Sequence, residues 1–88
     1  MNGIEPKYEK ITDDMIERAR AYPINELIEF NRAGFAPCPW HDETSPSLHH
    51  NSKNNTVHCF GCHKTVDTIG WLMDREGMKF QDAVRRLI

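Results

Sequence analysis

Three cysteines and one histidine in the middle of the chain have the types and the spacing of a metal site. Cys38 and His41 form one pair, Cys59 and Cys62 form a second, and seventeen residues separate the two pairs. Two intervening residues within a pair let one sharp turn direct both donors toward the same point. Two such turns supply four ligands and close the tetrahedral shell of a structural Zn²⁺ site. The spacing therefore predicts one zinc ion that stabilises the fold.

Two further histidines are alternative ligands, because His58 and His63 lie directly beside the second pair. A turn with donors at i and i+3 presents Cys59 and Cys62 together, which favours the two cysteines as ligands. Free cysteines buried as small apolar residues would leave the paired spacing unexplained.

A catalytic zinc site is a different possibility. The segment His41-Asp42-Glu43 reads as H-x-E, and the second cysteine pair reads as C-x-x-C, which are elements of zinc nucleoside deaminases. However, His58 stands where that signature has proline, and Cys38 closes the position that a catalytic water needs. We therefore expect no catalytic residue in this chain and a polar, turn-fixing role for Glu43.

Length and composition predict one small domain. The chain has 88 residues, of which 39% are hydrophobic, and no apolar run near the roughly 20 residues that span a bilayer. A chain of this length buries only about 60 to 65% of its unfolded surface, so a metal is a plausible reinforcement of the core. Three cysteines cannot form a framework of disulfides alone, and no secretory signal opens the chain. We expect a cytoplasmic location and no membrane partner.

The charge balance argues against electrostatic attraction of nucleic acid over a large part of the surface. Lysine and arginine number 11 against 13 aspartate and glutamate, a formal net charge of −2. Three thiolates with one Zn²⁺ add a site of formally −1. The acidic excess lies before residue 35, and from Phe35 onward the charges balance. Because the charges of this part balance, any contact with DNA should be local. The histidines after Phe35 gain positive charge as the pH falls toward about 6.5.

The N-terminal part, residues 12–32, is predicted to hold two helices. Thr12 is a good N-cap, because acidic residues follow it in the first turn and an apolar stripe begins there. Pro23 suits the first turn of a second short helix that ends before Gly34. The apolar residues at helical spacing are Met15, Ile16 and Ala19 in the first helix and Ile24, Leu27 and Ile28 in the second.

Residues 35–64 are predicted to form the ribbon itself. Strands are expected over 47–51 and 55–60, joined as a hairpin by the polar turn 52–54. Two helices then follow over 67–88, the first capped by Asp67 and ended by Gly77. The expected core positions of these helices are Ile69, Leu72, Met73, Phe80, Ala83, Val84 and Leu87.

The fold class expected from these elements is α+β. A small zinc ribbon with an antiparallel sheet or hairpin is flanked by short N-terminal and C-terminal helices. Residues 1–10 are an N-terminal extension, and residues 11–88 form a single domain.

The chain resembles the zinc-binding domain of bacterial DnaG-type DNA primases. Three segments and a set of downstream residues carry the likeness: Cys38-Pro39-Trp40-His41-Asp42-Glu43, Ser45-Pro46-Ser47, His58-Cys59-Phe60-Gly61-Cys62, and Asp67, Ile69, Leu72, Met73, Glu76, Gly77, Phe80, Ala83 and Val84. The region 12–36 resembles the leading helices of the family more loosely. The resemblance implies a ribbon whose sheet contacts single-stranded template DNA and assists RNA primer synthesis in DNA replication.

Catalysis lies in another domain in that family. The resemblance therefore implies that this chain alone does not polymerise, and that its partners are a primase catalytic domain or a replicative helicase, in cis or in trans. A fragment of a longer primase and a stand-alone phage or mobile-element protein both fit the sequence. A zinc-shaped protein adaptor that binds no nucleic acid is a further alternative, which the charge balance permits.

The chain departs from the family pattern at several positions. Leu48, Thr56 and Val57 stand where the family strands usually have aromatics, and His63 and Val66 replace glycines after the last cysteine. Because each base stacked on an aromatic ring contributes roughly 1 to 3 kcal/mol, these losses predict weaker binding of a single strand.

Several residues are candidates for contact with nucleic acid: Lys53, Lys64, His49, His50, His58, Trp40 and Phe60. The two lysines offer few phosphate contacts. For Trp40 and Phe60, packing over the ligand sulfurs is favoured over stacking on bases. Trp71 is expected to pack between helices and sheet, although it is also a candidate anchor for a partner protein. Arg85 and Arg86 are expected to face solvent near a helix C-terminus.

Overall fold

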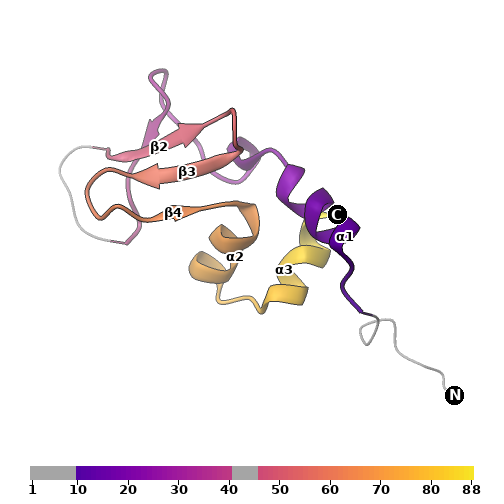
Figure 1. The fold of residues 1–88 in the computed structure, drawn as a ribbon. Helices are drawn as coiled ribbons and strands as arrows, with labels where there is room; N and C mark the ends of the chain where they lie inside the picture. Colours follow the sequence, from indigo (N-terminus) through magenta and orange to yellow (C-terminus); the bar gives the residue numbers. More distant parts are fainter. Residues whose placement is uncertain (1–9, 41–45) are drawn as a thin grey trace, which may run out of the picture.

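Four short antiparallel strands and three α-helices make up the part of the chain that this computed structural model describes, residues 10–40 and 46–88. The elements in order are α1 (Asp13–Ala21), the 3₁₀ turn η2 (Ile24–Glu26), β1 (Phe35–Ala36), β2 (Leu48–Asn51), β3 (Thr56–Cys59), β4 (Thr65–Val66), α2 (Thr68–Glu76) and α3 (Phe80–Leu87). The sheet lies at one end of the molecule and the three α-helices at the other (Figure 1). The predicted α+β class is confirmed. The expected extension falls almost wholly on residues 1–9, outside the described residues.

Helix α1 begins where its sequence predicts. The Thr12 hydroxyl accepts a hydrogen bond from the Met15 amide at 3.1 Å, and Asp13 and Asp14 occupy the first turn, where the helix dipole favours acidic groups. The second helix is shorter than expected, a single 3₁₀ turn, η2. Residue Ile24 is nevertheless fully buried, so the turn still delivers an apolar side chain to the core.

The sheet has the order β1-β2-β3-β4, with every neighbouring pair antiparallel. The predicted hairpin is the central pair, β2 and β3. The two-residue edge strands β1 and β4 were not predicted. Side chains alternate between the two faces of a strand, and directly paired residues share a face. The register therefore puts Ala36, Leu48, His50, Val57, Cys59 and Val66 on one face, called here the inner face, and Phe35, His49, Asn51, Thr56, His58 and Thr65 on the other, called the outer face.

Two clusters of buried apolar side chains hold the molecule together. The first lies under the inner face of the sheet and consists of Ile24, Ile28, Ala36, Cys38, Leu48, Val57 and Cys59. The second joins the three α-helices and consists of Ala19, Ile69, Leu72, Ala83, Val84 and Leu87. Leu27 and Trp71 pack against both clusters, so the expected position of Trp71 between helices and sheet is observed.

The C-terminal end of α1 is fixed by side chains from distant parts of the sequence. Asn55, in the turn before β3, donates from its amide to the carbonyl oxygens of Arg20 at 2.6 Å and Tyr22 at 2.7 Å. Its own side-chain oxygen accepts from the Ile24 amide at 2.9 Å. The buried Thr68 hydroxyl donates to the Ala19 carbonyl at 2.7 Å. These contacts satisfy backbone groups that a helix end leaves without partners.

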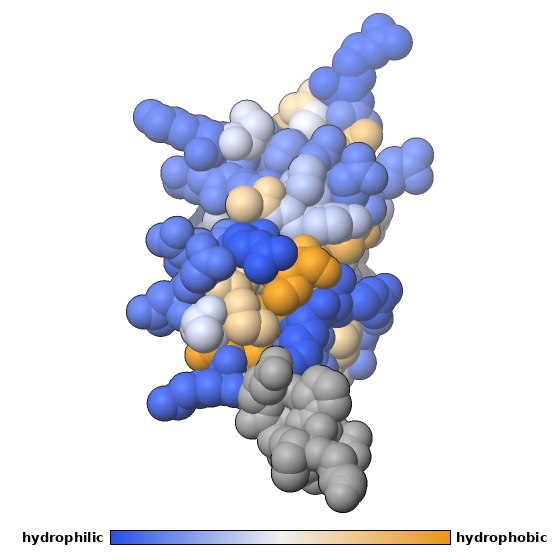
Figure 2. Space-filling view, turned by 90° about the vertical axis from the view of Figure 1, so that its right-hand side faces the viewer, coloured by the Kyte–Doolittle hydropathy of each residue, from blue (hydrophilic) through white to orange (hydrophobic). Residues whose placement is uncertain are grey.

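The C-terminal helices also begin and end as predicted. The Asp67 carboxylate accepts from the Gly70 amide at 2.8 Å, and Gly77 ends α2 in the left-handed conformation, with φ of 66°. Within α3, Ala83, Val84 and Leu87 are buried, whereas Phe80 stays 39% exposed. The face seen in Figure 2 is mostly hydrophilic, with apolar surface gathered near its middle. No helix among the described residues is long and apolar enough to cross a membrane.

Candidate functional site

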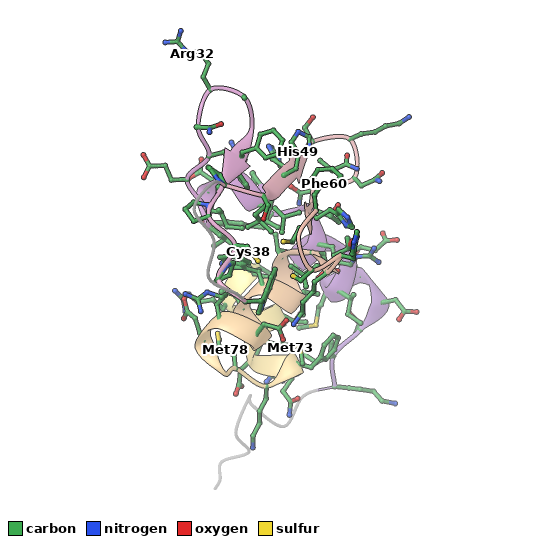
Figure 3. All side chains as sticks on the ribbon, turned by 90° about the vertical axis from the view of Figure 1, so that its left-hand side faces the viewer. Arg32, Cys38, His49, Phe60, Met73 and Met78 are labelled. Carbon is green, nitrogen blue, oxygen red and sulfur yellow. The ribbon has the colours of Figure 1, made fainter. Side chains whose placement is uncertain are left out.

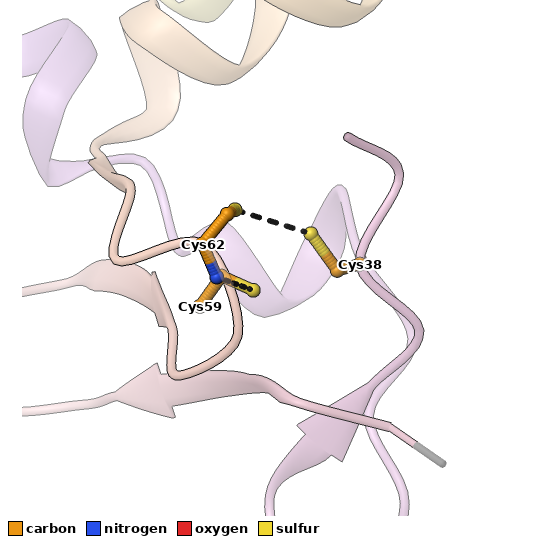
Figure 4. A group of neighbouring side chains, drawn as sticks. All are labelled: Cys38, Cys59 and Cys62. Carbon is orange, nitrogen blue, oxygen red and sulfur yellow. Dashed lines mark hydrogen bonds between the residues drawn. The ribbon is translucent and has the colours of Figure 1, made fainter. Parts of the chain in front are cut away.

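Three cysteine sulfurs meet where the sheet joins the helical end. Cys38 comes from the segment that follows β1, Cys59 is the last residue of β3, and Cys62 lies in the turn that follows β3 (Figure 4). Their sulfur atoms all lie within 4.8 Å of one another. Cys38 and Cys59 are buried, while Cys62 is exposed. The two segments thus bring together three of the four residues that the spacing predicts as ligands.

The distances within this cluster fit a zinc ion. A tetrahedral site with Zn–S bonds of about 2.3 Å places its sulfur atoms about 3.8 Å apart. The Cys38 and Cys62 sulfurs are separated by 3.8 Å. The fourth expected ligand, His41, and the deaminase-like Glu43 lie outside the described residues.

Cys59 is surrounded by groups that stabilise a thiolate. Its sulfur accepts from the Gly61 amide at 3.3 Å and from the Cys62 amide at 3.4 Å. The Ser47 hydroxyl lies 3.3 Å from the same sulfur. Such outer contacts orient a metal ligand and tune its basicity.

Cys38 is the ligand candidate whose protonation the fold changes most clearly. Burial raises the pKa of this thiol from its ordinary value of 9.0 to about 11, and the neighbouring thiols act in the same direction. A hydrogen bond with the backbone of Trp40 acts in the opposite direction. The metal-free chain therefore holds a neutral thiol here near neutral pH, and a zinc ion must displace its proton.

We expect zinc affinity to rise with pH for this reason. Between about pH 6 and about pH 8, each displaced proton increases the zinc association constant about tenfold per pH unit, and Cys38 contributes one such proton. Competition with a chromophoric chelator at several pH values measures the slope. After correction for protonation of the chelator itself, an association constant that does not change with pH would contradict the expectation.

The turn that carries Cys62 ends in a strained residue. His63 has a φ of 62°, in the left-handed region that costs a non-glycine residue roughly 1 to 2 kcal/mol. Its amide still donates to the Cys59 carbonyl at 2.7 Å, so the turn closes despite the side chain. The family pattern has a glycine near this position, and the histidine that replaces it pays the free-energy cost of the left-handed backbone.

We expect the His63→Gly variant to be more stable than His63→Ala by about 1 kcal/mol. Both changes remove the imidazole, but only glycine relieves the left-handed backbone, and part of the gain is offset by greater freedom of the unfolded chain. Urea denaturation of both zinc-loaded variants gives the comparison. Equal free energies of unfolding would show that His63 is not strained in solution.

His58 and His63, the two histidines beside the second cysteine pair, contact residues other than the three cysteines. The Nδ1 atom of His58 lies 2.6 Å from the Thr65 hydroxyl, and its ring meets that of Phe60 edge-on at 5.0 Å. The His63 ring lies 6.2 Å from that of His58. The group of metal-binding side chains found among the described residues contains the three cysteines and neither of these histidines.

The outer face of the sheet carries a row of rings. Phe35, His49 and His58 are adjacent on β1, β2 and β3, and the Phe60 ring lies beside all three, at 6.4, 6.0 and 5.0 Å between centroids. Figure 3 shows His49 and Phe60 next to each other. Phe60 is 57% exposed, so it does not pack away as expected. Phe35 was missed because only the strand register reveals its place in the row.

Three positions of this chain lack the aromatic residues that the family pattern has, and only some of these positions lie on the outer face. Leu48 and Val57 are fully buried on the inner face, where a base could not reach an aromatic ring. Only Thr56 lies on the outer face. The expected loss of stacking positions at Leu48 and Val57 was therefore wrong.

Among the remaining candidates for contact with nucleic acid, some side chains already interact with other residues and some are exposed. Lys64 forms an ion pair with Asp74 at 2.8 Å, and its Nζ lies 4.6 Å from the centroid of the Trp40 ring. Trp40 also meets Trp71 edge-on at 5.8 Å, so its ring is engaged in packing. The His50 ring, on the inner face, stacks on Phe30 at 4.8 Å.

Exposed basic side chains lie at the end of the sheet with the hairpin turn. Lys53 is exposed within that turn, and Arg32 is exposed in the loop before β1, where Figure 3 shows it projecting beyond the sheet. Arg32 was not among the expected candidates, since nothing in its local sequence marks it. At the opposite end, Arg86 pairs with Glu76 at 3.6 Å.

The four-stranded sheet, the cluster of three cysteine sulfurs and the helical layer together define a zinc ribbon with a structural metal site. The family model for the CHC2 zinc finger, the zinc ribbon of DnaG, matches residues 7–88. The chain therefore belongs to the family of DnaG-type primase zinc ribbons, and its cofactor is Zn²⁺.

Similar proteins agree with this assignment. The DNA primase of Thermotoga maritima is 40% identical over 67 residues, covering 73% of this chain and 12% of that protein. The DNA primase of Streptomyces coelicolor is 36% identical over 87 residues, covering 89% of this chain and 14% of that protein. The crystal structure of the Aquifex aeolicus primase, comprising zinc binding and RNA polymerase domains, has the same fold, with a TM-score of 0.74 at 24% identity, over 88% of this chain and 21% of that one. The chain thus spans a small part of its relatives.

Proposed function

We propose that this chain is the zinc-stabilised, template-contacting module of a primase system. It binds single-stranded DNA through the outer face of its sheet and assists RNA primer synthesis during DNA replication in the cytoplasm. It contributes binding and no catalysis, and it works with a primase catalytic domain or a replicative helicase, in cis or in trans. Residues 11–88 act as one domain after an extension at 1–10.

The metal holds this surface in place. Zinc is bound by Cys38, Cys59 and Cys62, with His41 as the fourth ligand. Structural zinc sites in small domains contribute on the order of 10 kcal/mol of apparent binding free energy, comparable to the whole stability of a domain. The turn between Cys59 and Cys62 also carries Phe60, so the metal and the exposed ring are parts of one local structure.

The observation that carries the proposal is the composition of the outer face. Its described residues provide rings and small polar groups, and none of them is acidic, although the whole chain has a net charge of −2. A nucleic acid strand therefore meets a surface that does not repel its phosphates. The relatives of the chain are DNA primases, which supports a DNA template as the ligand.

The proposal is tested by titrating fluorescent single-stranded DNA with the zinc-loaded 88-residue chain at low salt. Saturable binding is expected, together with its loss after zinc is removed by a chelator and its recovery when zinc is returned. Duplex DNA of the same sequence serves as the control ligand and should bind more weakly. If no single strand binds at low salt, the proposal fails, and the zinc-shaped protein adaptor becomes the better description.

A further inference from the structure

We infer that His58 and His63 form a second metal site, separate from the cysteine cluster, which takes a divalent transition ion that prefers imidazole, such as Zn²⁺ or Ni²⁺. The two imidazoles supply two ligands, and water fills the remaining positions of the ion. Because it has only two protein ligands, this site exchanges its metal more readily than the structural zinc site. The inference does not depend on the proposed function.

The two rings lie close enough to bind one ion together. Their centroids are 6.2 Å apart. With metal–nitrogen bonds of about 2.0 to 2.1 Å, two imidazoles on one tetrahedral ion have ring centroids roughly 5 Å apart. His63 is exposed, so a rotation of its side chain brings the rings to this separation. Imidazole is a preferred ligand of zinc, copper and nickel ions, which defines the class of metal.

The imidazole of His58 is held in the way that is typical of metal-binding histidines. Its Nδ1 atom lies 2.6 Å from the Thr65 hydroxyl. In the tautomer that donates from Nδ1, the Nε2 atom carries the lone pair and is the atom that binds a metal. A hydrogen bond from the opposite ring nitrogen to an oxygen fixes both the tautomer and the orientation of a ligand histidine. The Phe60 ring, edge-on at 5.0 Å, supports the same imidazole.

The backbone of His63 is the second observation that indicates a function for this pair. Its φ of 62° is unfavourable for any residue other than glycine or asparagine. The turn itself needs no imidazole, because it is closed by the hydrogen bond from the His63 amide to the Cys59 carbonyl at 2.7 Å. Glycine would make the same hydrogen bond without strain. Strained residues cluster at functional sites, and what histidine adds here is a ring beside His58.

Another histidine, His49, is the alternative partner for His58. The two are paired across β2 and β3 on the outer face. The His49 ring, however, contacts the rings of Phe35 and Phe60, at 4.7 and 6.0 Å. Within residues 10–40 and 46–88, the ring contact between two histidines is that of His58 with His63. The geometry therefore favours His63 as the second ligand.

The charges nearby permit a second cation. Three thiolates with one Zn²⁺ give the structural site a formal charge of −1, so the occupied cysteine cluster attracts a further positive ion. The neighbouring cation, Lys64, is paired with Asp74 at 2.8 Å, which compensates its charge. A second divalent ion therefore meets no uncompensated lysine beside His63.

The site is tested by titrating the untagged, zinc-loaded chain with Ni²⁺ at about pH 7.5, where most imidazoles are neutral. Calorimetry should show one bound Ni²⁺ in addition to the zinc, and mass spectrometry should show that the zinc is retained. Because Ni²⁺ is paramagnetic, the ring signals of His58 and His63 should broaden first in NMR spectra of the histidine side chains. Titration with additional Zn²⁺ should give the same stoichiometry.

Three variants identify the ligands. His63→Gly removes one imidazole and relieves the backbone, so it should keep its structural zinc and lose the additional ion. Thr65→Val removes the hydroxyl that orients His58 and should weaken Ni²⁺ binding about 10- to 100-fold. His49→Asn removes a histidine from the same face and should bind Ni²⁺ as the unchanged chain does. Each variant is first checked for one zinc ion per chain.

Ni²⁺ binding that is equally tight in His63→Gly or in Thr65→Val would overturn the inference. Loss of binding in His49→Asn would also overturn it, because the metal would then belong to the cross-strand pair. So would the absence of any additional ion, or release of the structural zinc by Ni²⁺ in its place. None of these results depends on DNA, so the proposed function stands or falls separately in the titration with a single strand.

Discussion

Replacing Cys59 with alanine is expected to abolish the cooperative folding of the ribbon. Cys59 is fully buried, and its sulfur belongs to the cluster that fits a tetrahedral metal. Loss of a structural zinc ion removes on the order of 10 kcal/mol, which exceeds or equals the stability of most small domains. Zinc content by mass spectrometry and thermal unfolding by circular dichroism give the readout.

A milder change at the same place provides the comparison. Ser47→Ala deletes the hydroxyl that lies 3.3 Å from the Cys59 sulfur but keeps every proposed ligand. It should retain one zinc ion and lose only about 1 kcal/mol of stability. A Cys59→Ala chain that still bound zinc and melted cooperatively near the temperature of the unchanged chain would mean that zinc is not the main support of the fold.

Asn55→Asp should cost more than about 3 kcal/mol, although the two side chains have nearly the same shape. The amide of Asn55 donates to two backbone carbonyls and its oxygen accepts from the Ile24 amide. An aspartate loses both donors, at about 1 kcal/mol each or more, and places a negative charge beside two carbonyl oxygens. The backbone itself is not disturbed, because aspartate, like asparagine, tolerates the φ of 57° found here. Urea denaturation of the zinc-loaded chain measures the loss.

The neighbouring residue offers a matched control for charge and composition. Asn54 is exposed, and Asn54→Asp adds the same charge one position earlier in the same turn. Its effect should stay within about 0.5 kcal/mol, as for most surface substitutions. Equal effects of the two substitutions would argue that charge in the turn, and not the three hydrogen bonds, accounts for the loss.

The sequence predicted well those features that depend on near neighbours. The caps at Thr12, Asp67 and Gly77 are local hydrogen-bonding and backbone preferences, and all three were confirmed. The central hairpin was also correctly placed, because alternating strand residues flank a polar turn. Metal-ligand spacing belongs to the same kind of information, since two residues between donors fix the shape of one turn.

Features that arise from tertiary contacts were not predicted. The edge strands β1 and β4 have two residues each and exist only through pairing with the hairpin. The expected second helix is limited to one 3₁₀ turn, and the amide of its first residue, Ile24, bonds to Asn55 from 31 positions away. Likewise, the pairing of Phe35 with His49 depends on sheet register, and the exposed position of Phe60 depends on how the turn after β3 lies against the sheet. The ion pair that engages Lys64 also required three-dimensional information.

Because of the hydrogen bonds at its end, α1 depends on side chains from the ribbon and from the C-terminal helices, and neither part can be replaced independently. Asn55 and Thr68 reach groups on the α1 side from 33 and 49 residues away, so the ribbon and the C-terminal helices both complete the N-terminal helix. In a ribbon transplanted without α1, the Asn55 amide would lose its two carbonyl acceptors and turn to water, and an α1 placed on another ribbon would need an equivalent asparagine. Recombination within this family would therefore be expected to exchange the unit from residue 12 onward as a whole, with its two hydrophobic clusters inherited together.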